Sequence, residues 1–143
     1  GQTANVTFNV TGTANDVLTL NVNDSAIAAH TTTGSANFLI DSVAPSIPTG
    51  VRASVKASRV TVNWTASSDG SGSGVSSYEV YRSTSSTFGG TATLAGTVTG
   101  TSFQESTASL SGTVYYFVVA ADKAGNRSAA SIPASVAIST KRR

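Results

Sequence analysis

Residues 59–65 read RVTVNWT, and the alternation in this stretch decides the fold class. Val60, Val62 and Trp64 share one face of an extended strand, because successive side chains of a β-strand point to opposite sides. The polar residues between them fall on the other face. The pattern predicts a strand that is buried on one side, with the only tryptophan of the chain at the centre of the core.

Similar short strands are expected along the rest of the chain, each bounded by glycine, serine, proline or asparagine. No sustained 3.6-residue apolar period with flanking caps indicates a helix. Many short strands without helices predict an all-β fold, and we expect an antiparallel β-sandwich. Beyond residue 50 the expected strands cover residues 51–55, 59–65, 77–82, 93–98, 114–121 and 132–138.

The same alternation predicts which side chains are buried. In VYYFVVAA, residues 114–121, the predicted buried face carries Tyr115, Phe117 and Val119 and ends at Ala121. Tyr116 then points outward, as does Tyr81 on an earlier strand. These two tyrosines either pack against a neighbouring module or form a small platform for sugar or protein contact. The predicted structural core comprises Trp64, Tyr78, Val80, Tyr115, Phe117 and Val119.

The first 42 residues contain three further expected strands, at residues 5–10, 17–22 and 36–40. In the first of them Val6, Phe8 and Val10 share one face. Turn-forming residues between the first two strands predict a hairpin. Three strands can form a sheet, but they cannot form a closed sandwich.

Two prolines separate this group from the strands that follow. Pro45 and Pro48 cannot donate hydrogen bonds to a β-ladder, so strand pairing is expected to stop there. We therefore expect a stiff, extended linker at residues 43–49 between two β-modules.

The composition limits the possible classes of function. Charged residues make up only 11% of the chain, hydrophobic residues make up 39%, and the net charge is +2, which favours a folded chain solubilised by hydroxyl groups. The absence of cysteine excludes disulfides, thiolate zinc sites and cysteine nucleophiles. The apolar stretches are far shorter than the roughly 20 residues of a membrane-spanning helix, so no membrane insertion is expected. Basic residues are dispersed apart from a tail at residues 141–143, and no basic stripe with stacking aromatics indicates nucleic-acid binding.

No group of residues in the sequence indicates a catalytic, cofactor or metal site. His30 lies in a polar stretch without a Ser-His-Asp signature, which is typical of a loop histidine. Asp69, Asp122 and Asn126 flank loops where oxygen ligands would suit calcium, but they lack the spacing of a calcium loop and are expected to cap their own turns. The seven carboxylates are expected to lie apart, without local pairing: Asp16, Asp24, Asp41, Asp69, Glu79, Glu105 and Asp122.

Several separated motifs over about residues 45–140 resemble a fibronectin type III domain of the bacterial kind. They are PTGV at 48–51, VTVNW at 60–64, YEVYRS at 78–83, GTVYYFVVAAD at 112–122 and AGNRS at 124–128. The resemblance implies that Trp64 is the core tryptophan of the second strand of that domain. It also implies that Tyr115 is the tyrosine-corner residue, whose hydroxyl reaches back to nearby backbone.

The start of the chain resembles part of a bacterial surface Ig-like repeat. GQTANVTF at 1–8 is similar to an early strand of such repeats, and FLIDSVAP at 38–45 is similar to their closing strand and linker. A complete repeat is about twice as long. The expected domains are an incomplete Ig-like segment at 1–42, the linker at 43–49, a fibronectin type III domain at 50–140 and the basic tail at 141–143.

These features predict a non-catalytic bacterial module, extracellular or on the cell surface, with a structural, adhesive or assembly role. A sheet edge left open near Val6, Phe8 and Val10 is a candidate assembly strand, because unpaired backbone groups attract a strand from another chain. A filament or array subunit is one hypothesis. The alternative is an accessory module, either a spacer or a carbohydrate-contacting one, of a secreted polysaccharide-degrading enzyme, because such enzymes carry similar type III domains. The expected partners are neighbouring β-modules or copies of the chain, and surface glycans are a further candidate.

Overall fold

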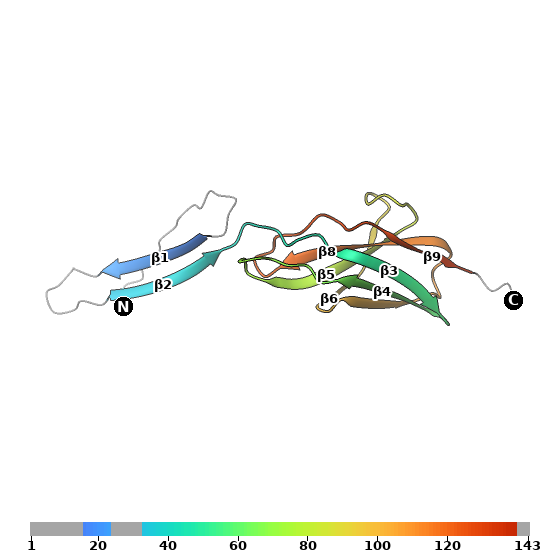
Figure 1. Cartoon of the computed structure of the whole chain (residues 1–143), viewed down its shortest axis with the longest axis horizontal. Helices are drawn as coiled ribbons and strands as arrows, with labels where there is room; N and C mark the ends of the chain where they lie inside the picture. Colours follow the sequence, from blue (N-terminus) through green and yellow to red (C-terminus); the bar gives the residue numbers. More distant parts are fainter. Residues whose placement is uncertain (1–15, 24–32, 140–143) are drawn as a thin grey trace.

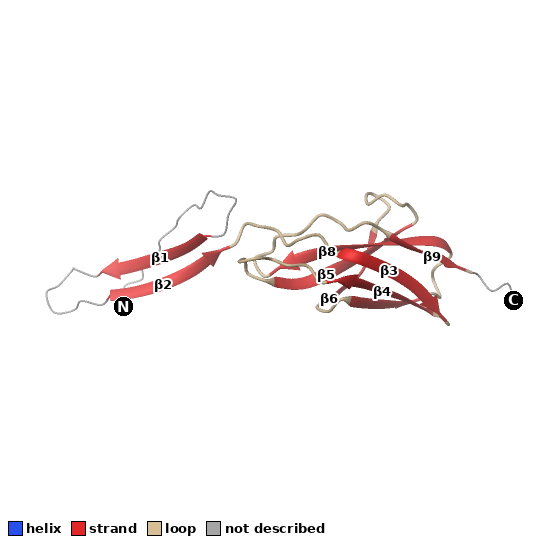
Figure 2. Ribbon diagram, in the orientation of Figure 1, coloured by secondary structure: helices blue, strands red, loops and turns tan. Residues whose placement is uncertain are grey.

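The computed structural model describes residues 16–23 and 33–139. In these residues the chain forms strands and loops and no helix, as Figure 2 shows. The strands belong to three antiparallel sheets. The smallest sheet pairs β1 (Asp16–Asn23) with β2 (Thr33–Ile40). The candidate assembly strand with Val6, Phe8 and Val10, which is the first strand of the expected hairpin, lies outside the described residues, as do His30 and the basic tail. The second strand of that hairpin is β1, and it pairs with β2.

The other two sheets form the sandwich, which confirms the predicted all-β fold class (Figure 1). One sheet has the strand order β3-β4-β7 and the other has the order β6-β5-β8-β9. The bounds of these strands are β3 Thr49–Lys56, β4 Arg59–Thr65, β5 Val75–Ser83, β6 Thr93–Val98, β7 Ser102–Ser106, β8 Gly112–Asp122 and β9 Ala134–Ile138.

The core of the sandwich centres on one face of β4. Val60, Val62 and Trp64 are buried there, as the alternation of the strand requires. The Trp64 ring packs edge-on against Tyr78 of β5, with 5.4 Å between ring centroids and 62° between ring planes. Val80, two residues further along β5, is fully buried in the same core.

The predicted core face of β8 was the wrong one. Val114, Tyr116, Val118 and Ala120 lie in the core, so Tyr116 is fully buried instead of pointing outward. The pairing of β8 with β5 decides this, because Ala120 stands opposite the inward Tyr78. Residues 114–121 are apolar on both faces, so alternation alone could not make the choice.

The other face of β8 is turned away from the core, yet it is largely covered. Phe117 and Val119 are buried on this outer face, while Tyr115 is half-buried. The tyrosine hydroxyl that reaches across the sandwich belongs to Tyr116, and it donates a hydrogen bond to Glu105 Oε1 at 2.7 Å. The expected role of Tyr115 is therefore corrected: a neighbouring tyrosine makes the long-range contact, and its partner is a side chain instead of backbone.

The segment between β2 and β3 lies against the sandwich. Pro45 and Pro48 are both buried. Ser46 N donates to Ser68 O at 2.8 Å, and Ser68 N donates back to Ser46 Oγ at 2.9 Å. Figure 1 shows this segment running from the end of β2 along the loops of the sandwich into β3. We call residues 41–48, between the end of β2 and the start of β3, the linker from here on. The linker is therefore attached to the domain that follows it.

Candidate functional site

Three carboxylates from distant parts of the sequence meet where the linker reaches the sandwich. Asp41 follows β2, Asp69 lies in the β4–β5 loop and Asp122 ends β8. Each of them contributes an oxygen, and these oxygens all lie within 4.8 Å of one another. Asp122 is buried and the other two are half-buried. The expectation that the carboxylates lie apart is wrong for these three. The pairing of β5 with β8 brings Asp122 to the loop of Asp69, and Ser73 of the same loop donates to Asp41.

The glycine-rich loop at residues 69–75 is folded around Asp69. Gly74 N donates to Asp69 Oδ2 at 2.6 Å, and Gly72 N donates to Asp69 O at 2.9 Å. Gly74 has a φ of 88°, which favours glycine. A Cβ atom at Gly72 would lie 2.5 Å from Asp69 Oδ2. The glycines therefore allow the loop to close around a carboxylate.

The same loop binds the linker through Asp41. Ser73 N donates to Asp41 Oδ2 at 2.6 Å, and Val43 N donates to Asp41 Oδ1 at 3.1 Å. Hydrogen bonds from Ser73 are the main cause that holds the pKa of Asp41 below its usual value. The bonded form of this side chain is therefore the ionised carboxylate.

Asn126 joins the β8–β9 loop to the side chain of Asp122 and to the backbone of Asp41. Asn126 N and Nδ2 each donate to a carboxylate oxygen of Asp122, at 2.8 Å in both cases. The same Nδ2 donates to the carbonyl oxygen of Asp41 at 3.0 Å. We call Asp41, Asp69, Ser73, Asp122 and Asn126 the linker clamp, because together they connect two loops of the sandwich to the linker.

The linker clamp has two chemical capacities. Its carboxylate oxygens are of the type that hard cations such as calcium accept, so Asp41, Asp69 and Asp122 are the residues that could hold one. Its backbone N–H donors also stabilise the carboxylates without an ion, which is how the hydrogen bonds above hold the linker. The sequence indicates Asp69, Asp122 and Asn126 as turn residues, but it does not predict that Asp41 and Ser73 join them. The one indication in the sequence is that Asp41, Asp69, Ser73, Asp122 and Asn126 all follow or precede expected strands, and a sandwich brings strand ends together.

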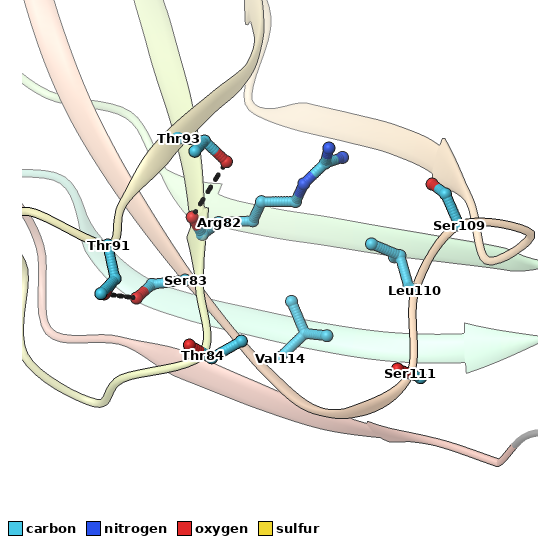
Figure 3. A pocket seen from close by; sticks show the side chains of 9 residues that line it. All are labelled: Arg82, Ser83, Thr84, Thr91, Thr93, Ser109, Leu110, Ser111 and Val114. Carbon is cyan, nitrogen blue, oxygen red and sulfur yellow. Dashed lines mark hydrogen bonds between the residues drawn. The ribbon is translucent and has the colours of Figure 1, made fainter.

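A hydroxyl-rich hollow lies at the other end of β5. Its volume is about 200 Å³. In Figure 3, Leu110 and Val114 point toward its middle, and the drawn hydrogen bonds join Ser83 to Thr91 and Thr93 to the Arg82 carbonyl. Ligand pockets usually measure about 300–1,000 Å³, so this hollow is too small for more than a fragment of a ligand. The residues that line it are Arg82, Ser83, Thr84, Thr91, Thr93, Ser109, Leu110, Ser111 and Val114.

Comparisons with known proteins find the chain similar to parts of an exoglucanase and of a chitinase. No family model matches it. The chain is 37% identical over 141 residues to exoglucanase B of Cellulomonas fimi. This match covers 98% of the present chain and 12% of the exoglucanase. It is 38% identical over 143 residues to chitinase A1 of Niallia circulans, which covers 95% of this chain and 18% of the relative. The chain thus spans less than a fifth of the length of either enzyme.

The solved structures give the fold. A crystal structure of an Fn3-like protein from Clostridium thermocellum matches with a TM-score of 0.53 and 26% sequence identity. The match covers 69% of this chain and 99% of that protein. The described residues of the present chain also contain no helix that could cross a membrane. The sandwich from β3 to β9 is thus a fibronectin type III domain.

Proposed function

We propose that this chain is an accessory module of a secreted bacterial enzyme that degrades polysaccharide. Its role is to act as a spacer that holds the segment before it in a fixed direction. The observation that carries this proposal is the linker clamp, together with the buried prolines of the linker. The similarity to an exoglucanase and a chitinase supports the choice of enzyme class.

The linker differs from a flexible connection in its chemistry. A linker rich in glycine and serine behaves as a random coil, so the modules it joins reorient freely. Here the linker contains Pro45 and Pro48, which restrict the backbone and are buried against the sandwich. Its carbonyl, carboxylate and N–H groups bond to loops of the same sandwich. These contacts favour a defined angle between the type III domain and whatever precedes it.

The hypothesis of a filament or array subunit has less support. It depends on the open edge near Val6, Phe8 and Val10, and these residues lie outside the described part of the chain. The relatives that match over most of the chain are named as enzymes. A spacer in such an enzyme accounts for both the similarity and the attached linker.

The test uses the natural polypeptide that carries this chain. Residues 41–139 are replaced by a Gly/Ser linker of equal length, and hydrolysis of insoluble cellulose or chitin is compared with hydrolysis of a soluble oligosaccharide. We expect slower hydrolysis of the insoluble substrate and an unchanged rate on the soluble one, because a spacer affects access and not chemistry. The proposal would be refuted if the replacement left the rates on both substrates unchanged. It would also be refuted if the natural polypeptide contained no catalytic domain.

A further inference from the structure

The two outer faces of the sandwich differ in chemistry. On the three-stranded sheet, the outward side chains of β4 include Arg59 and Asn63, both exposed and polar. On the four-stranded sheet, Tyr81 of β5 stands opposite Leu94 of β6 and Phe117 of β8. Residues opposite each other in an antiparallel ladder share a face, so these three form an apolar row across the sheet. Outward apolar patches of this kind mark contact surfaces more often than isolated residues do.

Phe88 of the β5–β6 loop lies over this row. Its ring centroid is 5.2 Å from that of Tyr81, with 85° between the planes, and 5.3 Å from that of Phe117, with 59° between the planes. Phe117 is 2% exposed beneath it, while Phe88 itself is 42% exposed. We call Tyr81, Phe88 and Phe117 the aromatic cluster. The cluster buries one ring and presents another to the solvent.

The loop that carries Phe88 is held by its own hydrogen bonds. Ser83 Oγ and Thr91 Oγ1 lie 2.7 Å apart and close the base of the loop, a contact visible in Figure 3. Ser85 N donates to Ser83 Oγ at 2.9 Å, and Ala92 N donates to the carbonyl of Gly89 at 2.8 Å. A ring that is already positioned loses less conformational entropy when it binds a partner.

Polar groups border the aromatic cluster, and their charges cancel. Arg127 forms an ion pair with Glu79, and its Nη2 donates to the Tyr81 hydroxyl at 2.7 Å. The Tyr81 hydroxyl in turn donates to Glu79 Oε2 at 2.8 Å. A border without net charge does not favour an ionic partner. Guanidinium, carboxylate and phenol groups can, however, exchange hydrogen bonds with the hydroxyl groups of a sugar.

We infer that the aromatic cluster is a contact site for a neutral polysaccharide such as cellulose or chitin. A pyranose ring has an apolar C–H face, which an exposed ring such as Phe88 can cover, and hydroxyl edges, which the Arg127–Glu79–Tyr81 border can bond. The choice of a polysaccharide over a protein partner rests on the proposed function. The geometry of the cluster is independent of the proposed function. The site would bind a chain already near the enzyme and would not require a deep pocket.

The experiment titrates the complete 143-residue chain with cellohexaose and with N-acetylated chitohexaose, followed by amide and arginine side-chain NMR shifts. Phe88→Ala removes the exposed ring. Ile132→Ala is the matched control, because Ile132 is a large apolar residue that is 85% exposed in a different groove. Tyr81→Phe keeps the second ring but removes its hydroxyl. We expect saturable shifts at the Phe88 loop and Arg127, and binding at least about tenfold weaker in Phe88→Ala, with Ile132→Ala unchanged.

Three results would overturn the inference. The first is that neither oligosaccharide causes shifts at the cluster. The second is that Phe88→Ala binds the oligosaccharides as tightly as the natural chain does. The third is that the chain self-associates through Phe88 while the sugars cause no shift. The last result would assign the cluster to protein contact. If the sugars cause shifts at the cluster but replacing residues 41–139 in the parent enzyme has no effect, only the proposed function is refuted. An effect of that replacement without shifts would refute only the contact site.

Discussion

Tyr116 is fully buried, and its hydroxyl donates to Glu105, which also forms an ion pair with Arg82. We expect Tyr116→Phe to lower the free energy of unfolding by about 1–2 kcal/mol, because Glu105 loses a donor to its charged carboxylate. Denaturant unfolding followed by Trp64 fluorescence measures this change.

Tyr115→Phe is the control for this prediction, because Tyr115 is half-buried and its hydroxyl makes no hydrogen bond within the described residues. It should change stability by less than about 0.5 kcal/mol. A larger loss for Tyr115→Phe than for Tyr116→Phe would restore the tyrosine-corner role that the sequence suggested for Tyr115.

Asp41 gives the linker a dependence on pH. Its pKa is below the usual value of 3.8, mainly because Ser73 donates hydrogen bonds to the carboxylate. A lowered pKa in the folded state means that this contribution is complete above the usual pKa and is lost as the pH falls through the lower, folded value. The Ser73 amide shift should therefore titrate with a midpoint below 3.8 and be insensitive to pH near neutrality.

Asp41→Asn provides the control for the titration, because the neutral amide of asparagine does not titrate. The Ser73 shift of this variant should lack the acidic transition. A midpoint at or above the usual value in the natural chain would show that Ser73 does not hold the ionised carboxylate.

At the level of single residues, the sequence predicted burial where apolar and polar residues alternate, as in β4. In β8 it predicted the burial of Phe117 and Val119 correctly, but it chose the wrong core-facing side, because Tyr115 and Tyr116 are adjacent in a wholly apolar run. Which of the two tyrosines faces the core depends on the register of β8 against β5. In the folded sheet the inward Tyr78 stands opposite Ala120, and this pairing turns Tyr116 inward. Side-chain identity alone does not determine this register.

Among the elements, β6 reaches the core through a glycine. A Cβ atom at Gly96 would lie 2.6 Å from Cε2 of the buried Phe103 ring of β7. We expect Gly96→Ala to lower the free energy of unfolding by about 1–3 kcal/mol, because the ring has to move within a packed core. Thermal unfolding followed by circular dichroism measures the loss.

Gly100→Ala is the matched substitution, since a Cβ atom there would meet no atom within 4 Å. It should be nearly neutral. Equal stability of the two variants would mean that the contact between β6 and β7 is looser than the structure shows.

The linker clamp connects elements of the sandwich to the linker, and Asn126 is the residue that tests it. Asn126→Ala removes the side-chain bonds to Asp41 O and to Asp122 Oδ2. Amide exchange of Ser46, which donates to Ser68, should become roughly tenfold faster or more, because the linker opens locally without global unfolding. Exchange of core amides such as Val80 should stay unchanged.

Asn63→Ala, on the exposed face of β4, serves as the control for Asn126→Ala. Faster exchange of both Ser46 and Val80 in Asn126→Ala would indicate a general loss of stability and would contradict a local clamp.

Most elements could be predicted from the sequence, because β-branched and aromatic residues alternate in them. The exception is β7 (SFQES), which has a single large apolar residue, Phe103, between polar ones. The linker clamp could not be predicted, since Asp41 and Asn126 are 85 residues apart in the sequence and meet only in the folded chain.

In the whole molecule, we expect the linker and the type III domain to move as one body. This claim links the hydrogen bonds of Asp41 and Asn126 to the proposed role as a spacer, because a spacer with a free linker could not set a direction. It also separates the role of the linker from that of the aromatic cluster, which belongs to the outer sheet face and would act independently.

The most direct test is ¹⁵N relaxation of the backbone amides in residues 41–48 of the complete chain. A linker that is fixed to the sandwich should have order parameters of about 0.85, equal to those of the sandwich strands. Values below about 0.6 in the linker, with rigid strands on its C-terminal side, would contradict this expectation. The type III domain would then be joined to its neighbour by a flexible connection, and the proposed spacer role would fail.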